Sequence, residues 1–407
     1  MSGLKYWLWL TTRQGLDSAG VLTVLDYFVT PERAYYADRE EYDQLPLSPK
    51  ARAGLCSKEL EGADRILADC QRLSLRIMTL RDGDYPERLR QISAPPAVLY
   101  IRGRTFDFDE EAAIAVVGSR NPSQYGEMAA SKLGMELASG GALVLSGIAE
   151  GLDTCAIKGA LKAGGPVVSV LGGGVDVPYP AVNRYLYEDV AAAGALISEY
   201  PPGTEPKGFH FPRRNRILSG LALGVLAVEC QLHSGTMSTV RHAMDQDRDI
   251  FAIPGAIDAP MSEGTNWLIQ QGAKLVTRGE DILEEYRSRF PGRLGRRELL
   301  SAQAAQQRLE DLEREKPAAP MEKAKPVEEK QPPLERVPKA EQADRFTDDQ
   351  LAILRALGEE SRSAEELVEQ TGIPARRILS ALTMLQVSRA VEEGPGRRFF
   401  ALLRLET

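Results

Sequence analysis

The sequence predicts an α/β protein, in which a mostly parallel sheet is preceded by a helical region and followed by a winged helix. Three observations support this fold class. From about residue 112 onward, short β-branched runs alternate with helical stretches, which is typical of a parallel sheet with helical crossovers. Several of these runs end in glycine, at the edge where such sheets bind ligands. Residues 346–407 predict three helices and then a β-hairpin.

Length and composition are those of a globular protein with several domains. The 407 residues suggest two or three domains of roughly 150 residues each. Neither a membrane span nor a signal peptide is expected, because no apolar run reaches about 18 residues and the apolar start is brief. The four cysteines are scattered and form no CxxC pair, so we expect neither a zinc site nor a disulfide framework, and a cytoplasmic location. The net charge of −8 does not favour nucleic acid, although binding needs only a local basic patch.

Residues 1–110 are expected to form a helical domain. Apolar residues at helical spacing predict a helix over 63–71. Glycines before the apolar stretch 21–28 predict a short helix–turn–helix unit. A short strand is expected at 97–101, directly after a turn that contains two prolines.

Residues 111–290 are expected to form the α/β core. Its strands are predicted at 113–117, 143–145, 167–171, 195–198, 225–229, 250–253 and 274–276. The helices between them are predicted at 125–137, 153–163 and 237–246.

Residues 291–345 predict a disordered linker. This stretch contains no Phe, Trp or Tyr, and six prolines fall between Pro317 and Pro338. Such a segment cannot bury enough apolar surface to fold alone.

Residues 346–407 predict the winged helix. Thr347 with Gln350 and Ser363 with Glu366 each resemble a capping box that opens a helix. Gly372 is expected to end the second helix and Pro374 to begin the third. The turn at 394–396 then joins two strands of a hairpin.

Three glycine turns follow predicted strands. The first, Val117-Gly118-Ser119-Arg120, would present backbone N–H groups and one arginine to an anion, although Gly118 could serve only a tight turn and Arg120 could simply be solvated. The second runs from Ser146 and Gly147 to Asp153, which could cap the next helix. The third covers residues 172–180. None matches a dinucleotide fingerprint or a Walker loop.

The densest candidate stretch is residues 207–216, which carries four cations, two phenylalanines and one histidine. Aromatic rings can stack on bases while guanidinium groups contact phosphates, so the pattern favours single-stranded nucleic acid. The alternative is a helix start with Phe209 and Phe211 in the core. A further turn, Ser234-Gly235-Thr236, could bind a phosphate or cap a helix. No catalytic residue, metal ligand or cofactor is expected, since neither a GxSxG elbow nor a ligand spacing occurs.

Seven ordered motifs between Val116 and Val276 resemble the DNA-processing protein A family (DprA, also called Smf). The N-terminus resembles the family's sterile-alpha-motif-like or helix-hairpin-helix-like domain, and the tail resembles the winged helix of some members. The motifs are Val117-Gly118-Ser119-Arg120, Ser146-Gly147-Ile148-Ala149-Glu150-Gly151-Leu152-Asp153, Tyr179-Pro180-x-x-Asn183, Ser198-Glu199-Tyr200-Pro201, Phe209-His210-Phe211-Pro212-x-Arg214-Asn215-Arg216, Ser234-Gly235-Thr236 and Ile253-Pro254-Gly255.

The resemblance implies an extended Rossmann-like core that binds single-stranded DNA without sequence preference or catalysis. It also implies a homodimer that protects incoming strands and helps load RecA in natural transformation. By position, Arg120 would contact phosphate, Phe209 or Phe211 would stack on a base, and Lys207, Arg214 and Arg216 would form a basic rim. The residues expected to bind nucleic acid are Gly118, Ser119, Arg120, Gly147, Arg184, Lys207, Phe209, Phe211, Arg213, Arg214, Asn215, Arg216, Ser234, Gly235 and Thr236.

Two features depart from the family or stay open. Ile157 stands where the family commonly has histidine, so a DNA contact made by that histidine would be lost here, and Leu152 replaces the usual isoleucine. In the tail, cations could contact DNA, while nearby glutamates would repel it, so protein docking is equally open. The cations are Arg376, Arg377, Arg397 and Arg398, and the glutamates are Glu365, Glu366, Glu392 and Glu393.

Two other functions are weighed. Similar cores occur in phosphoribohydrolases, which makes a nucleotide-processing enzyme the alternative. The turn Gly172-Gly173-Gly174-Val175 lacks the proline and the Gly-Thr of those enzymes. A scaffold that docks proteins through its tail and linker is the third possibility.

Overall fold

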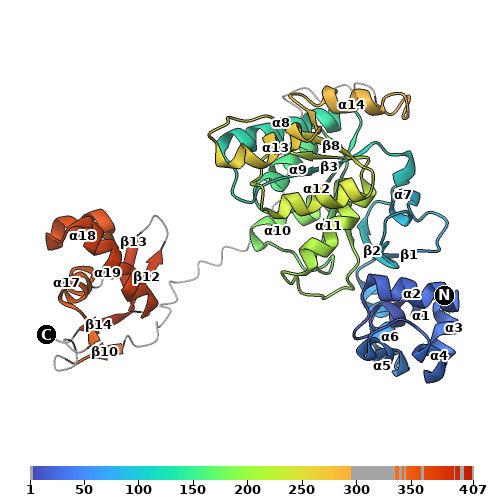
Figure 1. The fold of residues 1–407 in the computed structure, drawn as a ribbon, viewed down its shortest axis with the longest axis horizontal. Helices are drawn as coiled ribbons and strands as arrows, with labels where there is room; N and C mark the ends of the chain where they lie inside the picture. The colour runs from blue at the N-terminus through green and yellow to red at the C-terminus, as the bar shows by residue number, and fades with distance from the viewer. Residues whose placement is uncertain are drawn as a thin grey trace. The chain divides into compact units, whose positions relative to one another are not determined.

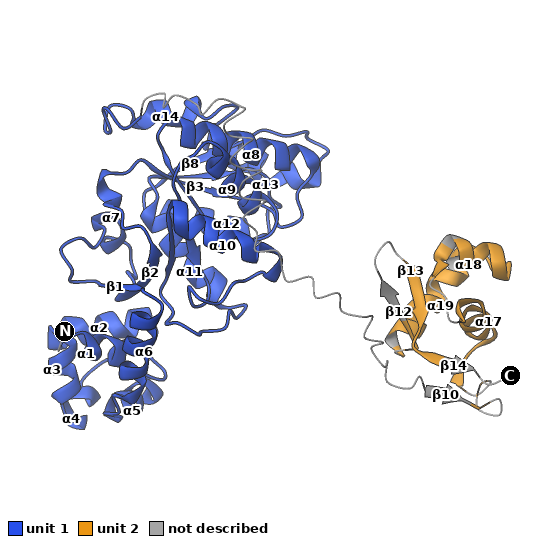
Figure 2. Ribbon diagram, turned by 180° about the vertical axis from the view of Figure 1, so that it is seen from behind, with its two compact units in different colours: residues 1–316 blue, residues 317–407 orange. Residues whose placement is uncertain are grey.

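The computed structural model describes residues 3–294, 335–338, 342, 345–358, 362–388, 390–394 and 398–405. The chain forms two compact units, residues 1–316 and 317–407 (Figure 2). Most of the predicted linker, 291–345, lies outside the described residues, and its disorder stays a prediction there. At its end, however, β10 (Glu335–Val337) is a strand that pairs parallel with β14 (Leu403–Leu405) of the second unit, so the prediction of disorder is wrong for these residues. Arg397 and residues 395–396, at the tip of the predicted hairpin, also lie outside the described residues. In the described parts of the chain, no helix has the length and apolar character needed to cross a membrane.

A nine-stranded sheet organises the first unit. Its strand order is β1-β2-β6-β5-β4-β3-β7-β8-β9, and β3 to β9 run parallel. At one edge, β1 (Arg76–Thr79) pairs antiparallel with β2 (Val98–Gly103), which pairs antiparallel with β6. The parallel strands are β3 (Ala113–Val117), β4 (Leu143–Ser146), β5 (Val167–Leu171), β6 (Ala195–Ser198), β7 (Gly224–Ala227), β8 (Asp249–Ala252) and β9 (Lys274–Leu275).

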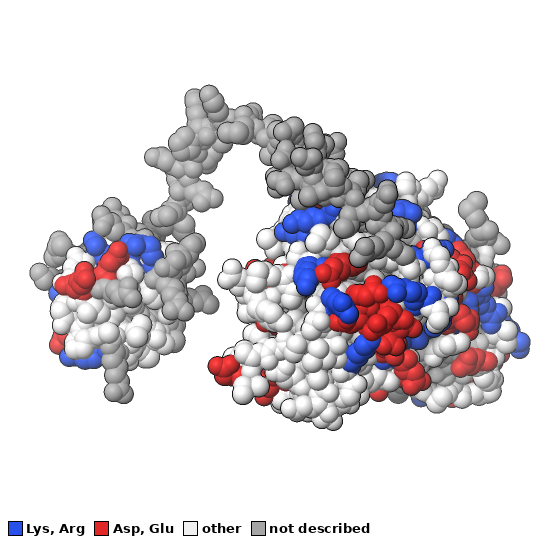
Figure 3. All heavy atoms as spheres, turned by 90° about the horizontal axis from the view of Figure 1, so that it is seen from above, with Lys and Arg blue, Asp and Glu red and all other residues white. Residues whose placement is uncertain are grey.

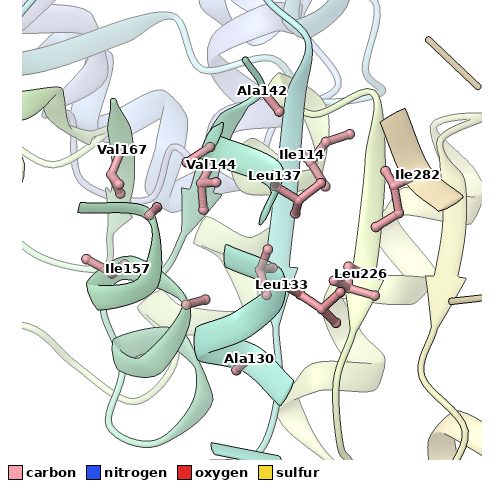
Figure 4. Close-up of a cluster of buried hydrophobic side chains, with 14 of the residues drawn as sticks. Ile114, Ala130, Leu133, Leu137, Ala142, Val144, Ile157, Val167, Leu226 and Ile282 are labelled. Atoms are coloured by element: carbon pink, nitrogen blue, oxygen red, sulfur yellow. The ribbon is translucent and has the colours of Figure 1, made fainter. Parts of the chain in front are cut away.

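Helices cover both faces of this sheet, which confirms the predicted fold class (Figure 1). One apolar cluster joins the sheet to four helices, and Figure 4 shows Leu137 beside Ile114 and Leu133 beside Leu226. A second cluster joins the other face to three longer helices and to the short helix α7 (Glu87–Arg90). The first set is α8 (Gln124–Ser139), α9 (Leu152–Lys162), α10 (Arg184–Ala193) and α14 (Glu280–Tyr286); the second is α11 (His210–Leu221), α12 (Gly235–Asp245) and α13 (Glu263–Gln270).

The strand order reverses at β3. Strands β4, β5 and β6 follow on one side of β3, whereas β7, β8 and β9 follow on the other. Consecutive crossovers therefore leave in opposite directions from β3, and the loops at the carboxyl ends of the strands diverge there. This is the position where open α/β sheets bind their ligands.

The first part of the chain is helical, with a core of its own. Trp9, Phe28 and Tyr42 are among its buried side chains. The helices are α1 (Leu4–Thr11), α2 (Ser18–Phe28), α3 (Pro31–Tyr36), α4 (Arg39–Asp43), α5 (Pro49–Cys56) and α6 (Glu61–Arg72). The sequence predicted helices at α2 and α6, and the strand at β2, but not β1.

The second unit is a small helical domain with a three-stranded sheet. The two predicted capping boxes form, at Thr347 with Gln350 and at Ser363 with Glu366. Gly372 ends the second helix in the left-handed region at φ 71°. Pro374 lies just before the third helix rather than inside it. The elements are α17 (Asp348–Leu357), α18 (Ala364–Thr371), α19 (Ala375–Val387), β11 (Arg362–Ser363), β12 (Val391–Gly394) and β13 (Arg398–Ala401).

Candidate nucleic-acid interface

A small pocket lies where β3, β4 and β5 end. It has a volume of about 90 Å³ and opens to solvent. Three of the predicted glycine turns and the start of α11 contribute to this region of the sheet. The residues that line the pocket are Arg120, Gly147, Ala149, Glu150, Tyr179, Pro180, Phe211 and Arg214. The structure thus brings Arg120, Gly147, Phe211 and Arg214 of the predicted site together.

The turn after β3 is fixed by backbone contacts, and its arginine is exposed. The Ser119 N–H donates to the carbonyl of Glu229 at 2.8 Å, and the Ser119 carbonyl accepts from Leu152 N–H at 3.1 Å. A methyl group on Gly118 would overlap the Leu152 side chain. The predicted phosphate contact through the Ser119 N–H is therefore wrong for this conformation, since that donor is already used. Gly118 is needed for close packing.

Arg120 is exposed at the lip of the pocket. Its guanidinium lies 5.5 Å from the centre of the Phe211 ring. The ring orients the cation without neutralising it, because a cation–π contact supplies no negative charge. Arg120 can therefore pair with a phosphate while keeping this contact.

Arg214 is buried at the base of the pocket. Its Nη1 donates to the carbonyl of Gly147 at 3.1 Å and to that of Val170. Burial lowers the pKa of this guanidinium, and the nearby carboxylate of Asp153 opposes that shift. A Cβ on Gly147 would lie 2.5 Å from Nη2 of Arg214, so only glycine leaves room for the arginine. Arg214 thus shapes the pocket floor and supplies positive potential from below.

Asp153 organises the turn after β4. The sequence suggested that Asp153 caps α9. In the structure, Gly151 holds the N-cap position instead. The Asp153 carboxylate accepts from Gly147 N–H at 3.0 Å and from Ala149 N–H at 3.4 Å. Burial raises the pKa of this carboxyl, against the lowering effect of Arg214. The N–H groups of Gly147 and Ala149 are therefore bound within the protein.

Two aromatic rings form one wall of the pocket. Phe211 and Tyr179 lie 5.5 Å apart between ring centres, with 34° between their planes. Tyr179 is 45% exposed, and Phe211 is half-buried. Tyr179 was not among the predicted site residues. The signal that could have found it is the Tyr179-Pro180 motif at the end of the glycine turn that follows β5.

A second exposed ring lies just outside the pocket. Phe209 is 56% exposed, and the guanidinium of Arg213 lies 5.5 Å from its ring. Lys207 is exposed on the same turn. Between the two phenylalanines, His210 is buried, with Nδ1 2.8 Å from the Gly172 carbonyl and its ring stacked on Tyr200. Phe209 is thus available to a ligand, contrary to the alternative that placed it in the core.

Arg216 does not belong to the basic rim of the pocket, where it was predicted. It is buried beside Glu199, 2.7 Å away, and both side chains contact the Ser18 hydroxyl of α2. The polar junction fixes the helical N-terminal part to α11, because α11 carries Arg216 and α2 begins with Ser18. Arg216 therefore has a structural partner and does not line the pocket.

The remaining predicted residues lie elsewhere on the sheet edge. Asn215 is buried and accepts from Arg214 Nε at 3.2 Å. Ser234, Gly235 and Thr236 start α12, after β7, outside the pocket. Arg184 is exposed at the start of α10. Their predicted contacts with nucleic acid stay predictions.

Ile157 packs into the core of the sheet. It is fully buried within the cluster that Figure 4 shows. Its side chain therefore reaches no ligand, and an apolar residue satisfies this position. Among the described residues, no group of three His, Cys, Asp or Glu side chains is arranged to hold a metal ion.

The arginines of the second unit are engaged by carboxylates. Arg377 lies 2.6 Å from Asp349, and Arg398 lies 2.9 Å from Glu366. On α19 the exposed large side chains include Leu379 and Met384, which are apolar. The side chains of Arg376, Glu365, Glu392 and Glu393 lie outside the described residues, as does Arg397.

One face of the first unit carries mixed charge. Figure 3 shows acidic and basic side chains side by side there. Lys274, for example, pairs with Glu284 at 2.7 Å, and Arg287 pairs with Glu280. Paired charges of this kind give little net potential. A polyanion is therefore better served by Arg120, Arg213 and Lys207 around the pocket.

Comparisons with known proteins agree on one family. The family model of DNA recombination-mediator protein A matches residues 76–287, and that of the DprA winged helix domain matches residues 332–397. The chain is 41% identical over 208 residues to the DNA processing protein DprA of Streptococcus pneumoniae, which is 51% of this chain and 73% of that protein. It is 38% identical over 221 residues to DprA of Bacillus subtilis, 54% of this chain and 74% of that protein. The X-ray structure of DprA from Streptococcus pneumoniae matches with a TM-score of 0.60 at 35% identity, covering 69% of this chain and 97% of that one.

Proposed function

The chain belongs to the DNA-processing protein A (DprA/Smf) family of recombination mediators, and from this premise we propose that it binds single-stranded DNA without sequence preference and without catalysis. The observation that carries the proposal is the pairing of exposed cations with accessible aromatic rings at one sheet edge. Arg120 lies over Phe211, and Arg213 lies over Phe209. Single-strand binders combine such cations for phosphates with rings for bases.

The shape of the pocket favours an unpaired base over a duplex. Its volume of about 90 Å³ lies beside the rings of Phe211 and Tyr179. A base can reach these rings only when it is unstacked, which a duplex prevents. Stacking on a ring is tolerant of sequence because every base has a π face.

The titration of a fluorescent oligonucleotide with the full chain tests this function. Affinity for a single strand is expected to exceed affinity for the duplex and to fall as salt rises, because cations on phosphates release counterions. Mixed and uniform sequences should bind alike. A response that is flat with salt, or equal binding of single and double strands, would reject the proposal.

We further propose that the protein acts as a homodimer which protects incoming strands and helps load RecA during natural transformation. Membership of a recombination-mediator family supports a role beside a recombinase. An apolar groove on α12 and α13, where Met244 and Trp267 are exposed, supports association between copies. Sedimentation of the full chain checks the dimer, and a strand-exchange assay with coated single strands checks loading.

A nucleotide-processing enzyme is the second candidate, and one observation favours it. Glu150 lines the same pocket as Arg120 and is exposed there. A carboxylate beside a phosphate-binding arginine could act as a general acid or base. Release of the free base from nucleoside monophosphates distinguishes the two functions, because a pure binding protein would release none.

A further inference from the structure

We propose a second base-stacking position beside the pocket, formed by Tyr185 of α10 and Lys158 of α9, which takes the next unpaired base of a strand held in the pocket. This inference rests on the proposed function, because it extends the path of the same DNA strand. The chemical class of its ligand is a nucleobase with an adjoining phosphate. The location, the fixed geometry, the chemistry and the surroundings of Tyr185 support the proposal.

Tyr185 follows the pocket residues closely along the chain. Tyr179 and Pro180 line the pocket, and the single turn η2 (Ala181–Asn183) follows them directly. The turn leads without a break into α10, whose second residue is Tyr185. A strand that leaves the pocket past Tyr179 therefore meets the start of α10.

Buried hydrogen bonds hold the start of α10 in place. Asn183 is buried, and its Nδ2 donates to the Ile148 carbonyl at 3.0 Å and to Oγ1 of Thr154 at 2.8 Å. These bonds fix the start of α10 to the turn after β4 and to α9. Because α9 also carries Lys158, the two helices hold Tyr185 and Lys158 in a defined relation to the pocket.

Tyr185 and Lys158 together offer an aromatic ring and a cation to a ligand. Tyr185 is 41% exposed, and Nζ of Lys158 lies 5.3 Å from the centre of its ring. Within the described part of the chain, the Tyr185 hydroxyl makes no hydrogen bond. A ring with an adjacent exposed cation repeats the arrangements of Phe211 with Arg120 and of Phe209 with Arg213. Rings and cations in this combination suit bases and phosphates.

Exposed side chains without charge connect the pocket to the proposed position. Tyr179, Val182 and Tyr185 are 45%, 63% and 41% exposed, so uncharged surface extends from the pocket to the proposed position. Arg184 is exposed beside it. Glu188, one turn further along α10, lies 2.6 Å from Arg102, which offsets its charge. The ridge therefore offers stacking surface with positive charge at its side.

Oligothymidylates of increasing length, titrated against the full chain by fluorescence anisotropy, test the inference. Affinity of the wild type should rise with length as successive bases engage. Tyr185→Ala should bind the longer oligonucleotides about five- to thirtyfold more weakly, since that is the range for loss of one stacked base. It should bind the shortest oligonucleotide that fills the pocket as the wild type does.

Matched variants separate stacking from folding. Tyr185→Phe keeps the ring and should bind like the wild type. Lys158→Ala should lower the number of ions released by about one. Tyr36→Ala, at a tyrosine of α3 that is 70% exposed, removes a ring from the N-terminal helices and should change nothing.

The outcomes distinguish this inference from the proposed function. If Tyr185→Ala binds every length like the wild type while Arg120→Ala binds all of them more weakly, the second position does not exist and the function stands. If the wild type binds no oligonucleotide, both fail. A loss for Tyr185→Ala that Tyr185→Phe shares would also overturn the inference, because stacking would not explain it.

Discussion

Two arginines of the pocket illustrate how environment divides one residue type between two tasks. Arg120 is exposed and faces the Phe211 ring, so its charge stays available to a ligand. Arg214 is buried and donates to backbone carbonyls, so it shapes the floor. The family resemblance implied a phosphate contact for Arg120 and a place in the basic rim for Arg214, because the pattern of cations does not reveal which side chain is buried. The partners of Arg214, Gly147 and Val170, lie far from it along the chain.

Arg120→Ala should weaken binding of every single-stranded sequence by a similar factor, about five- to thirtyfold. The variant removes one exposed phosphate contact and creates no cavity, so the fold should be unaffected. The dependence of affinity on salt should fall by about one ion. Anisotropy at several salt concentrations measures both effects. Arg39→Ala, at an arginine whose side chain is 83% exposed in α4, is the control and should bind normally.

His210 makes the stability of the pocket sensitive to acid. Burial lowers its pKa below the ordinary value of 6.5, although the hydrogen bond to the Gly172 carbonyl opposes the shift. The unfolded chain therefore takes up a proton before the folded protein does. The contribution of neutral His210 to stability is present above pH 6.5 and is lost as pH falls through the lowered value.

The corresponding variant is His210→Asn, whose amide can still donate to the Gly172 carbonyl. Urea midpoints at about pH 7.5 and about pH 5.5 should show a smaller loss of stability on acidification for the variant than for the wild type. His242, whose pKa burial also lowers, is present in both proteins and cancels in the comparison. Equal losses in the two proteins would contradict this assignment.

At the scale of elements, α11 connects the site to the N-terminal helices. Its first turns carry Phe211 and Arg214 to the pocket, and Arg216, two residues on, joins Glu199 and Ser18 of α2. Nη1 of Arg216 is buried and has no hydrogen-bond partner among the described residues. The guanidinium therefore depends on Glu199 for compensation of its charge.

Glu199→Gln should destabilise the protein by about 3–5 kcal/mol, because it leaves a buried arginine without its carboxylate. Urea unfolding of the full chain measures the loss, and the transition of the first unit should carry it. Glu280→Gln, which breaks an exposed pair with Arg287, is the control and should cost under about 0.5 kcal/mol. A similar small cost for both variants would show that the junction contributes little.

Much of the element plan could be predicted from the sequence. Strands β3, β5 and β6 of the parallel core are fully buried and mostly apolar, so they were predicted to the residue. The tail helices were predicted from their capping boxes, which are local signals. Strand β1 (Arg76–Thr79) was missed because only two of its four residues are buried and it depends on pairing with β2. The junction of Arg216 was missed for the same reason, since Ser18 lies 198 residues away.

At the scale of the whole molecule, the two units have separate apolar cores. The tail core includes Ile353, Ile378 and Leu385, all fully buried, and shares no member with the clusters of the first unit. Residues 346–407 contain eight arginines and ten acidic residues. The tail therefore folds around its own side chains and offers a polyanion no net attraction.

Removal of residues 295–407 should accordingly leave single-strand affinity within about twofold of the full chain, with the same dependence on salt. The physical reason is local: Arg377 and Arg398 are held by Asp349 and Glu366, while the exposed face of α19 presents Leu379 and Met384. Phosphates would have to displace those carboxylates, and the separation of such pairs offsets part of what a new contact contributes. A gel shift that compares both proteins measures the effect. A loss above tenfold on truncation would assign DNA contacts to the tail, whereas equal affinity leaves its apolar face for a protein.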